Sequence, residues 1–281
     1  MVDHNEKVAE YYDITLSYYK RFWHRDSESN ALHYGFWEND ARTVRDALLN
    51  ENKFLAELAG VTSGTKVLDA GCGVGGSAIW LAKNKGAHVV GITISKRQLE
   101  KAKELAGKHG VSDKVEFYLK DFTNTEFSDN SFDVVWAIES VCHAVDKKMF
   151  LREAYRVLKK GGRIVVADGF LRRKPNPSEE IGYKNLLEGF VLPGLASADK
   201  FREEIVEAGF RNMRFLDKTE ETKPSSKILY KRMRLFYPVV SFLNWLHIIP
   251  NVLLKNSKAG IAQWKLVKSG VSCYGVFYGE K

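Results

Sequence analysis

The chain has 281 residues, 44% hydrophobic and 28% charged, which is long enough for one large domain or two modest ones, each with a substantial core. With 43 Lys and Arg against 35 Asp and Glu, its net charge of +8 attracts anions but fits nucleic acid, an anionic membrane surface and a phosphorylated substrate equally well. No uncharged apolar run reaches the ~18 residues that a membrane span requires.

The three cysteines, Cys72, Cys142 and Cys273, stand far apart and outside any CxxC or Cys/His spacing. We therefore predict neither a metal site nor a disulfide framework. The first residues, MVDHNEKVAEYY, are charged and lack the apolar stretch of a secretory signal. Reduced thiols and this start predict a cytoplasmic protein.

The first 60 residues predict helical structure that is unusually rich in aromatic side chains. We interpret residues 1–60 as a helical cap on the rest of the chain. The aromatic side chains either pack the helices together or line a substrate site, and both interpretations stay open. The candidates for substrate contact are Tyr19, Trp23, Tyr34 and Trp37.

From residue 64 onward, apolar strand-like segments alternate with helix-like segments. This alternation predicts right-handed βαβ units and a parallel sheet with helices on both faces. The strands are apolar throughout, as burial on both faces requires. The predicted strands are 66–70, 87–94, 115–119, 132–138 and 162–167, and the predicted helices are 76–84, 96–108 and 147–158.

Three segments follow this alternation. Residues 170–211 begin as a Pro-rich loop and continue as helix, and the chain ends in a strand-like VSCYGVFYGEK. Between them, residues 217–270 are basic and apolar, and too long for a plain connection. We predict that residues 61–281 form one core that carries a helical lid at about 217–270.

The stretch KVLDAGCGVGGSA joins the first strand to a helix through closely spaced glycines. Such a turn lets the backbone approach a ligand closely, but alone it also fits a dinucleotide site or a purely structural turn. Asp69 would repel a pyrophosphate there, and Thr93 stands where a dinucleotide site has an acidic residue for the ribose. A carboxylate in this loop suits a cationic ligand, such as an ammonium or a sulfonium group.

Four motifs in order carry a resemblance: VLDAGCGVGG, GITIS with Gln98, DFTNTEFSDNSFDVVW and VLKKGGRIVVAD. Over about residues 64–168 the chain resembles class I S-adenosylmethionine-dependent methyltransferases. The resemblance implies an α/β, Rossmann-like sheet of seven mostly parallel strands, the last of them antiparallel, and S-adenosylmethionine as cofactor. The residues it implies are Asp69, Gly71 and Gly73 around the methionine part, Thr93 and Gln98 near the ribose and amino acid tail, and Asp121 and Phe122 near the adenine.

Shorter motifs resemble one branch of that family. HYGFW at 33–37, GITISKRQ and IESVCHA look like the branch of sterol, tocopherol and geranyl diphosphate C-methyltransferases. GxTxSxxQ is also shared with cyclopropane fatty acid synthases, which carry a cysteine beside their N-terminal aromatic motif that HYGFW lacks. The resemblance implies an apolar, isoprenoid or lipid-like acceptor.

Glu139 and His143 follow the buried strand 132–138, where ligands of open parallel sheets bind. Methylation of an alkene or aromatic carbon creates positive charge, which a carboxylate stabilises before accepting the departing proton. Aromatic rings stabilise the same charge without trapping it. The alternatives are a helix cap for Glu139 and a core histidine for His143.

These features predict C-methylation of an apolar acceptor by Glu139 and His143. The rivals are an N- or O-methyltransferase of a small amine or phenol, a cyclopropane-synthase-like lipid enzyme, and a protein that binds the cofactor without turnover. No base-flipping motif or RNA-binding appendage is visible, so we expect no nucleic-acid partner. The basic, apolar 223–254 stretch is either a covered helix pair or a lid that also contacts anionic membrane at its periphery.

Overall fold

A seven-stranded sheet with the order β3-β2-β1-β4-β5-β7-β6 forms the centre of the molecule. The structure is a computed structural model that describes residues 3–22, 33–38 and 41–281, with only the backbone described at 19–22. The strands are β1 (Lys66–Ala70), β2 (His88–Thr93), β3 (Val115–Leu119), β4 (Phe132–Ile138), β5 (Leu158–Leu171), β6 (Arg211–Asp217) and β7 (Ser272–Glu280).

The first five strands pair in parallel, and β7 runs antiparallel between β5 and β6. This confirms the predicted fold class, a mostly parallel Rossmann-like sheet. The segment Arg211–Asp217 was not picked out as a strand, because it lies at the sheet edge and keeps much of its length exposed. An edge strand needs no continuous apolar run, so the pattern used for the buried strands does not detect it.

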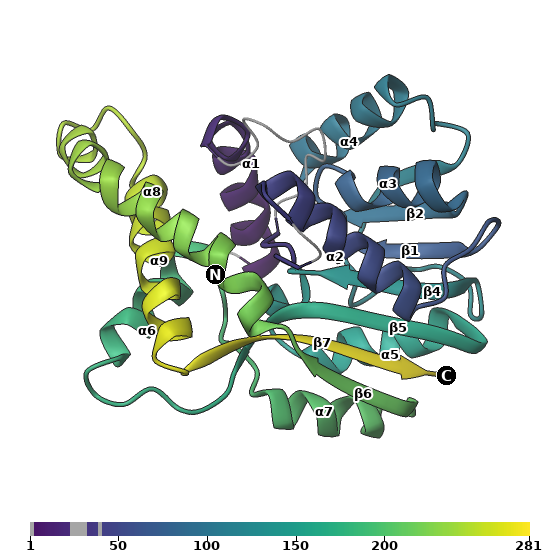
Figure 1. The fold of residues 1–281 in the computed structure, drawn as a ribbon. Coiled ribbons are helices and arrows are strands. Elements are labelled where there is room, and N and C mark those ends of the chain that lie inside the picture. Colours follow the sequence, from purple (N-terminus) through teal and green to yellow (C-terminus); the bar gives the residue numbers. More distant parts are fainter. Residues whose placement is uncertain (1–2, 23–32, 39–40) are drawn as a thin grey trace.

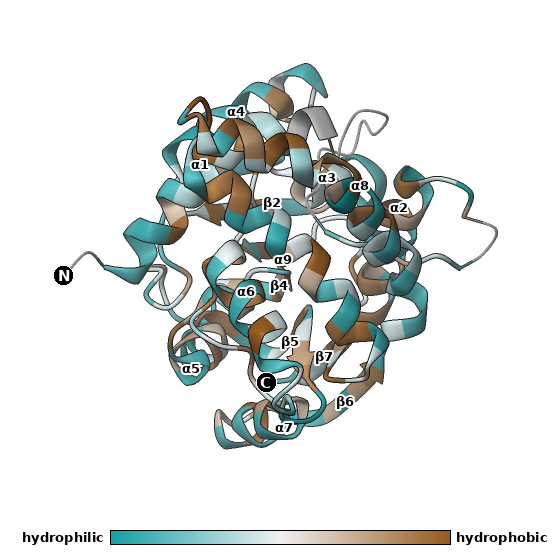
Figure 2. Ribbon diagram, turned by 90° about the vertical axis from the view of Figure 1, so that its left-hand side faces the viewer, coloured by the Kyte–Doolittle hydropathy of each residue, from teal (hydrophilic) through white to brown (hydrophobic). Residues whose placement is uncertain are grey.

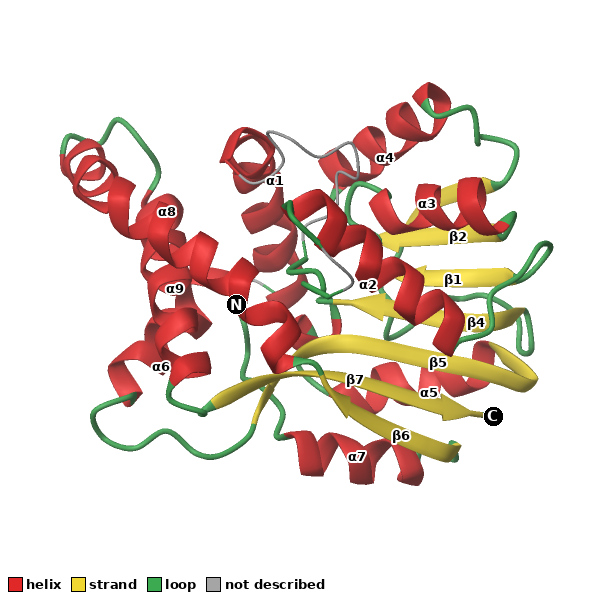
Figure 3. Ribbon diagram, viewed as in Figure 1, coloured by secondary structure: helices red, strands yellow, loops and turns green. Residues whose placement is uncertain are grey.

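Helices cover both faces of the sheet and also crowd one of its ends (Figures 1 and 3). The helices are α1 (His4–Phe22), α2 (Val44–Leu58), α3 (Gly76–Lys85), α4 (Lys96–Lys108), η1 (Val141–His143), α5 (Lys147–Val157), α6 (Glu180–Phe190), α7 (Ala198–Glu207), α8 (Thr219–Trp245) and α9 (Asn251–Lys268).

Two apolar cores result, one on each face of the sheet. The first joins side chains of α2, α3 and α4 to alternate residues of the strands, such as Val67 and Trp136. The second joins α5 and α7 to the residues that point the other way, such as Leu68 and Val135. Side chains alternate along a strand, so every apolar residue of β1 and β4 finds a core on one face or the other. Helix α2, within residues 1–60, contributes Leu55 to the first core. The predicted division into residues 1–60 and 61–281 stays a prediction.

The remaining helices, α1, α6, α8 and α9, gather where the parallel strands point (Figure 3). Figure 2 looks onto this end, with α6 and α9 in front of the strands. The helices α8 and α9 form the segment predicted as a lid, and α9 packs against both α8 and α6. The carboxyl ends of β1, β2 and β4 therefore open into a space enclosed by helices.

Candidate active site

All seven residues predicted to bind the cofactor line one pocket at the carboxyl ends of β1, β2 and β3. Asp69 lies in β1, Gly71 and Gly73 in the turn that leads to α3, and Thr93 at the end of β2. Gln98 comes from the first turn of α4, while Asp121 and Phe122 follow β3. Parallel strands end at the same edge of a sheet, which brings together residues more than 50 positions apart in the chain.

Asp69 presents a buried carboxyl oxygen to this pocket. The side chain is 3% exposed, and its Oδ2 atom has no hydrogen-bond partner among the described residues. Burial raises the pKa of Asp69 to about 7. A buried, unpartnered carboxyl oxygen is costly unless a ligand completes it. An ammonium group, such as the one on the amino acid part of S-adenosylmethionine, supplies the missing donors and charge, so the residues present fit that cofactor.

The glycine turn keeps its backbone close to the pocket. Gly71 has φ +90°, and a Cβ atom there would lie 2.4 Å from the Cβ of Ser140. Gly73 has φ +55°, and its Cβ would meet nothing nearer than Gln98 Nε2 at 3.9 Å. A side chain at 71 would therefore collide with the loop after β4, whereas one at 73 would point into open space beside Gln98. Both positions favour glycine through their left-handed backbone as well.

The other cofactor candidates already have partners. Thr93 Oγ1 donates to Gln98 Oε1 at 2.8 Å, and Asp121 Oδ2 accepts from Asn5 Nδ2 at 2.7 Å. Phe122 packs edge-to-face on Phe150. These contacts fix the walls of the pocket, and the bond to Asn5 also places α1 across its mouth.

Glu139 directly follows β4 in a strained, half-buried position. Its φ of 46° lies in the left-handed region, which costs a non-glycine residue ~1 kcal/mol or more. Oε1 accepts the backbone N–H of Tyr34 at 2.8 Å, so the carboxyl group does not cap the following helix. Burial, with Glu51 and Asp168 nearby, raises its pKa well above the usual value, although Tyr34 and the Tyr274 hydroxyl oppose the shift.

His143 lies near Glu139 but uses its ring nitrogens elsewhere. Nε2 contacts the Tyr12 hydroxyl at 2.8 Å, and Nδ1 lies 3.4 Å from the carbonyl of Val191. Burial lowers the pKa of His143 to about 4, so the ring is neutral at physiological pH. This geometry makes His143 a link between α1 and the loop after β4, and it is more suited to positioning than to proton transfer.

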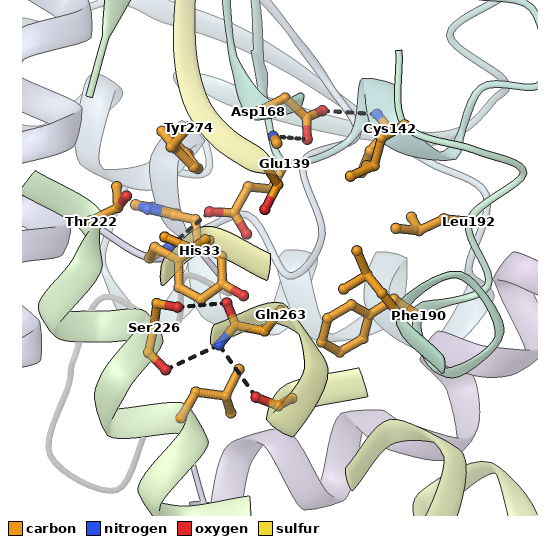
Figure 4. A pocket seen from close by; sticks show the side chains of 18 of the residues that line it. His33, Glu139, Cys142, Asp168, Phe190, Leu192, Thr222, Ser226, Gln263 and Tyr274 are labelled. Carbon is orange, nitrogen blue, oxygen red and sulfur yellow. Dashed lines mark hydrogen bonds between the residues drawn. The ribbon is translucent and has the colours of Figure 1, made fainter. Parts of the chain in front are cut away.

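A second pocket, lined by apolar side chains, adjoins the first. Tyr12, His33, Glu139 and His143 line both pockets and mark their junction. Figure 4 shows His33 and Tyr274 on one side of this second pocket, Phe190 and Leu192 on the other, and Glu139 between them. The apolar lining comes largely from α6, α8, α9 and nearby loops: Leu186, Phe190, Leu192, Leu195, Leu229, Met233 and Val267.

Of the four residues predicted to contact substrate, the structure brings one into this pocket. Tyr34 lines it, and its ring packs edge-to-face on Tyr274. Trp37 is not among the residues that line either pocket, because its indole N–H donates to Ser225 on α8 at 2.7 Å. The Tyr19 side chain and all of Trp23 lie outside the described residues.

Two buried groups at the pocket were missed by the sequence reasoning. His33 Nδ1 lies 2.5 Å from Glu51 Oε2, and its Nε2 atom finds no partner in the described part of the chain. Glu51 is fully buried and also accepts the Tyr274 hydroxyl at 2.7 Å. His33 was visible in the motif HYGFW, but Glu51 lies on a helix 18 residues away and gave no signal.

A third residue that the sequence reasoning missed is Asp168. It lies in β5, lines the apolar pocket and accepts the backbone N–H groups of Cys142 and Gly169. Burial raises its pKa to about 6. An acidic residue near the end of a buried strand is the same signal that identified Glu139, so VVAD could have revealed it.

Comparison with known proteins shows the family of the chain. Residues 61–215, more than half of the chain, match a family described as "Methyltransferase domain". The 27-O-demethylrifamycin SV methyltransferase of Amycolatopsis mediterranei is 32% identical over 219 residues, which cover 78% of this chain and 79% of that protein. The sterol 24-C-methyltransferase of Eremothecium gossypii is 31% identical over 228 residues, or 80% of this chain and 59% of that protein.

A solved structure shows the same fold throughout. The cyclopropane synthase MmaA2 from Mycobacterium tuberculosis superposes with a TM-score of 0.84 over 100% of this chain and 99% of that one, at 16% identity. The chain belongs to the methyltransferase family, and it is an S-adenosylmethionine-dependent enzyme. That the residues of the first pocket hold the methyl donor, with Asp69 at its ammonium group, stays a prediction.

The raised pKa of Asp69 predicts how cofactor affinity depends on pH. Below about pH 7 the carboxyl group is protonated in the cofactor-free protein, and binding an ammonium group favours its ionised form. Affinity should therefore rise about tenfold per pH unit between roughly pH 5 and pH 7, where an α-amino group stays protonated. Isothermal titration calorimetry across that range measures this slope. The control variant Asp168→Asn, outside the cofactor pocket, should show the same slope. Cofactor affinity that does not change with pH would contradict the role of Asp69.

Proposed function

We propose that the enzyme transfers a methyl group from S-adenosylmethionine to a carbon atom of an apolar, isoprenoid or lipid-like acceptor. The observation that carries this proposal is the position of Glu139 at the junction of the two pockets, half-buried and without a basic partner among the described residues. Its hydrogen-bond donor is the neutral backbone N–H of Tyr34, and the Tyr274 hydroxyl, which donates to Glu51, lies nearby. Such a carboxyl group is suited to a positive charge that appears only during the reaction.

The second pocket supports an apolar acceptor. Most of its lining is apolar, and a low dielectric strengthens charge interactions at the junction. Glu51 and Asp168 add buried carboxyl groups near Glu139. A cationic acceptor carbon is therefore stabilised in this pocket, whereas an anionic one is opposed.

Glu139 can act in two stages. Its raised pKa favours the protonated carboxyl group, and a positive charge nearby lowers that pKa and favours the carboxylate. The cofactor supplies an electrophilic methyl group. When the acceptor's alkene carbon forms the new C–C bond, the neighbouring carbon becomes cationic, and the Glu139 carboxylate stabilises it and then takes the proton whose loss restores the alkene.

A second candidate, methylation of an oxygen atom, is favoured by His33. Nδ1 is paired with Glu51, Nε2 has no partner among the described residues, and His33 lines both pockets. This is the arrangement of a general base that would remove a hydroxyl proton. One of the relatives, the rifamycin enzyme, methylates an oxygen by its name, while the sterol enzyme methylates a carbon.

One variant and one labelled product distinguish the two reactions. For carbon methylation, we expect His33→Gln to lower turnover by less than about tenfold, because no hydroxyl proton has to leave; loss of a positioned base would cost about 10²-fold or more. Incubation with methyl-¹³C cofactor and lipid extracts, followed by mass spectrometry and NMR, should show a C–CH₃ product. A methoxy product together with a large loss in His33→Gln would establish oxygen methylation instead.

A further inference from the structure

The far half of α8 has the opposite polarity to its base. At the base, the helix buries small polar side chains, including Thr222, Ser225 and Ser226. From residue 231 to residue 250, a segment that we name the α8 tip, no residue is buried. Figure 1 shows this part of α8 extending away from the sheet.

The α8 tip exposes a stripe of large apolar side chains. Leu235 is 73% exposed, Phe242 57% and Trp245 71%. With Val239 and Leu246, these residues follow spacings of three and four, so they share one face of the helix. Ile248, in the turn that follows, is 64% exposed. Scattered apolar residues on a surface are ordinary, but a continuous stripe marks contact with an apolar phase or a partner.

The charge around this stripe is of one sign. Residues 222–279 contain nine Lys and Arg and no Asp or Glu, so this segment alone exceeds the net charge of the whole chain. Lys227, Lys231 and Arg234 are exposed on α8, toward its base. At a rise of ~1.5 Å per residue, Arg234 lies about 12 Å along the helix from Phe242. If the end of the helix inserts shallowly into a bilayer, these basic side chains therefore lie at the level of the lipid headgroups.

A groove lies between the α8 tip and the second pocket, which we name the acceptor pocket. It runs between α1, α8 and α9 and is lined by apolar tip residues such as Val239 and Leu243. Leu229, Met233 and Asn256 line both this groove and the acceptor pocket. Side chains of α8 and α9 therefore separate the groove at the tip from the pocket that Glu139 lines by a single shared wall.

We propose that the α8 tip docks on an anionic lipid bilayer and that the groove takes the acceptor from it. Among the described helices none could cross a bilayer, so the contact is with one leaflet. Charge complementarity favours the bilayer over a second copy of the chain, because two basic tips repel each other. The uptake of acceptor rests on the function proposed above; the docking does not.

Co-sedimentation with vesicles tests the docking. We expect the protein to bind vesicles of phosphatidylcholine with phosphatidylglycerol much more tightly than phosphatidylcholine alone, and added salt should weaken this binding. Phe242→Ser with Trp245→Ser should lower the partition coefficient tenfold or more, because both rings would leave the lipid. Lys227→Gln and Lys231→Gln should each lower it about fivefold. The matched controls are Val206→Ser and Lys83→Gln, exposed residues on α7 and α3.

Two further measurements separate the possible failures. Turnover of acceptor dispersed in detergent should be unchanged in the tip variants, whereas turnover of acceptor embedded in vesicles should fall with binding. The docking would be overturned if the wild-type protein did not bind anionic vesicles, or if the tip variants bound them as tightly as the wild type does. The proposed methylation would stay intact in either case. A concentration-dependent dimer in analytical ultracentrifugation, lost in the Phe242/Trp245 variant, would assign the tip to a second copy instead. Vesicle binding without any methylated lipid would sustain the docking and refute the acceptor class.

Discussion

Replacing Glu139 by glutamine is expected to lower turnover about 10²-fold or more, with little change in cofactor affinity. The amide keeps the size of the side chain and can still accept the N–H of Tyr34. It cannot become negative when the acceptor carbon becomes cationic, and it cannot take the departing proton. Single-turnover rates with saturating cofactor, together with calorimetric cofactor binding, measure both quantities on the same preparation.

Stability provides the control for this variant. Because Glu139 is half-buried and its backbone lies in the left-handed region, the amide substitution also tests its structural role. Glu203→Gln on the exposed side of α7 is a matched change far from the pocket and should leave turnover and melting temperature as they are. An unaltered rate per folded Glu139→Gln molecule would contradict the carbocation mechanism, while the methyltransferase assignment would stand.

His143→Ala should lower turnover less than Glu139→Gln does, because the ring nitrogens of His143 contact Tyr12 and Val191.

Two changes in the cofactor pocket, Asp69→Ala and Gly73→Val, are each expected to abolish measurable binding of S-adenosylmethionine. Asp69→Ala removes the buried carboxyl oxygen that has no partner among the described residues. Gly73→Val adds a branched side chain to a backbone with φ +55° and directs it into the open space beside Gln98. Calorimetry measures the loss, and circular dichroism shows whether each variant is folded.

A second glycine separates backbone strain from obstruction of the pocket. Gly110 has φ +65°, and a Cβ atom there would meet nothing within 4 Å. Gly110→Val therefore introduces similar strain in the turn after α4, outside the cofactor pocket, and should bind cofactor normally. Micromolar affinity in both pocket variants would show that the cofactor site lies elsewhere.

The cofactor half of the site was predictable because its signals are local. The glycine turn, GITIS and the acidic residues after the strands each belong to one short segment, and the parallel sheet brings the ends of such segments together. Predicted strands 66–70, 115–119 and 132–138 agree with the structure to the residue. β5 is longer than predicted, since its second half pairs with β7 across a segment distant in sequence.

The acceptor half needed tertiary structure. The contact between His33 and Glu51 joins a loop to a helix, and the bond from Tyr274 to Glu51 spans 223 residues. Trp37, which looked like a substrate contact, donates to Ser225 on α8 instead. No periodicity records such pairings, because which donor reaches which carboxylate depends on how α2, α8 and β7 pack.

The sequence by itself therefore determined the class of protein, the sheet and the cofactor pocket, because strand burial and the glycine turn are imposed over a few neighbouring residues. The tertiary structure decided how Glu139 is held and that His143 bonds to Tyr12. It also decided that His33, at the junction of the two pockets, has an Nε2 atom without a partner among the described residues. It also decided that the apolar residues of the α8 tip face outward, which an amphipathic pattern leaves open. The physical reason is the same in each case: hydrogen-bond partners and exposure are set by packing between segments distant in the chain.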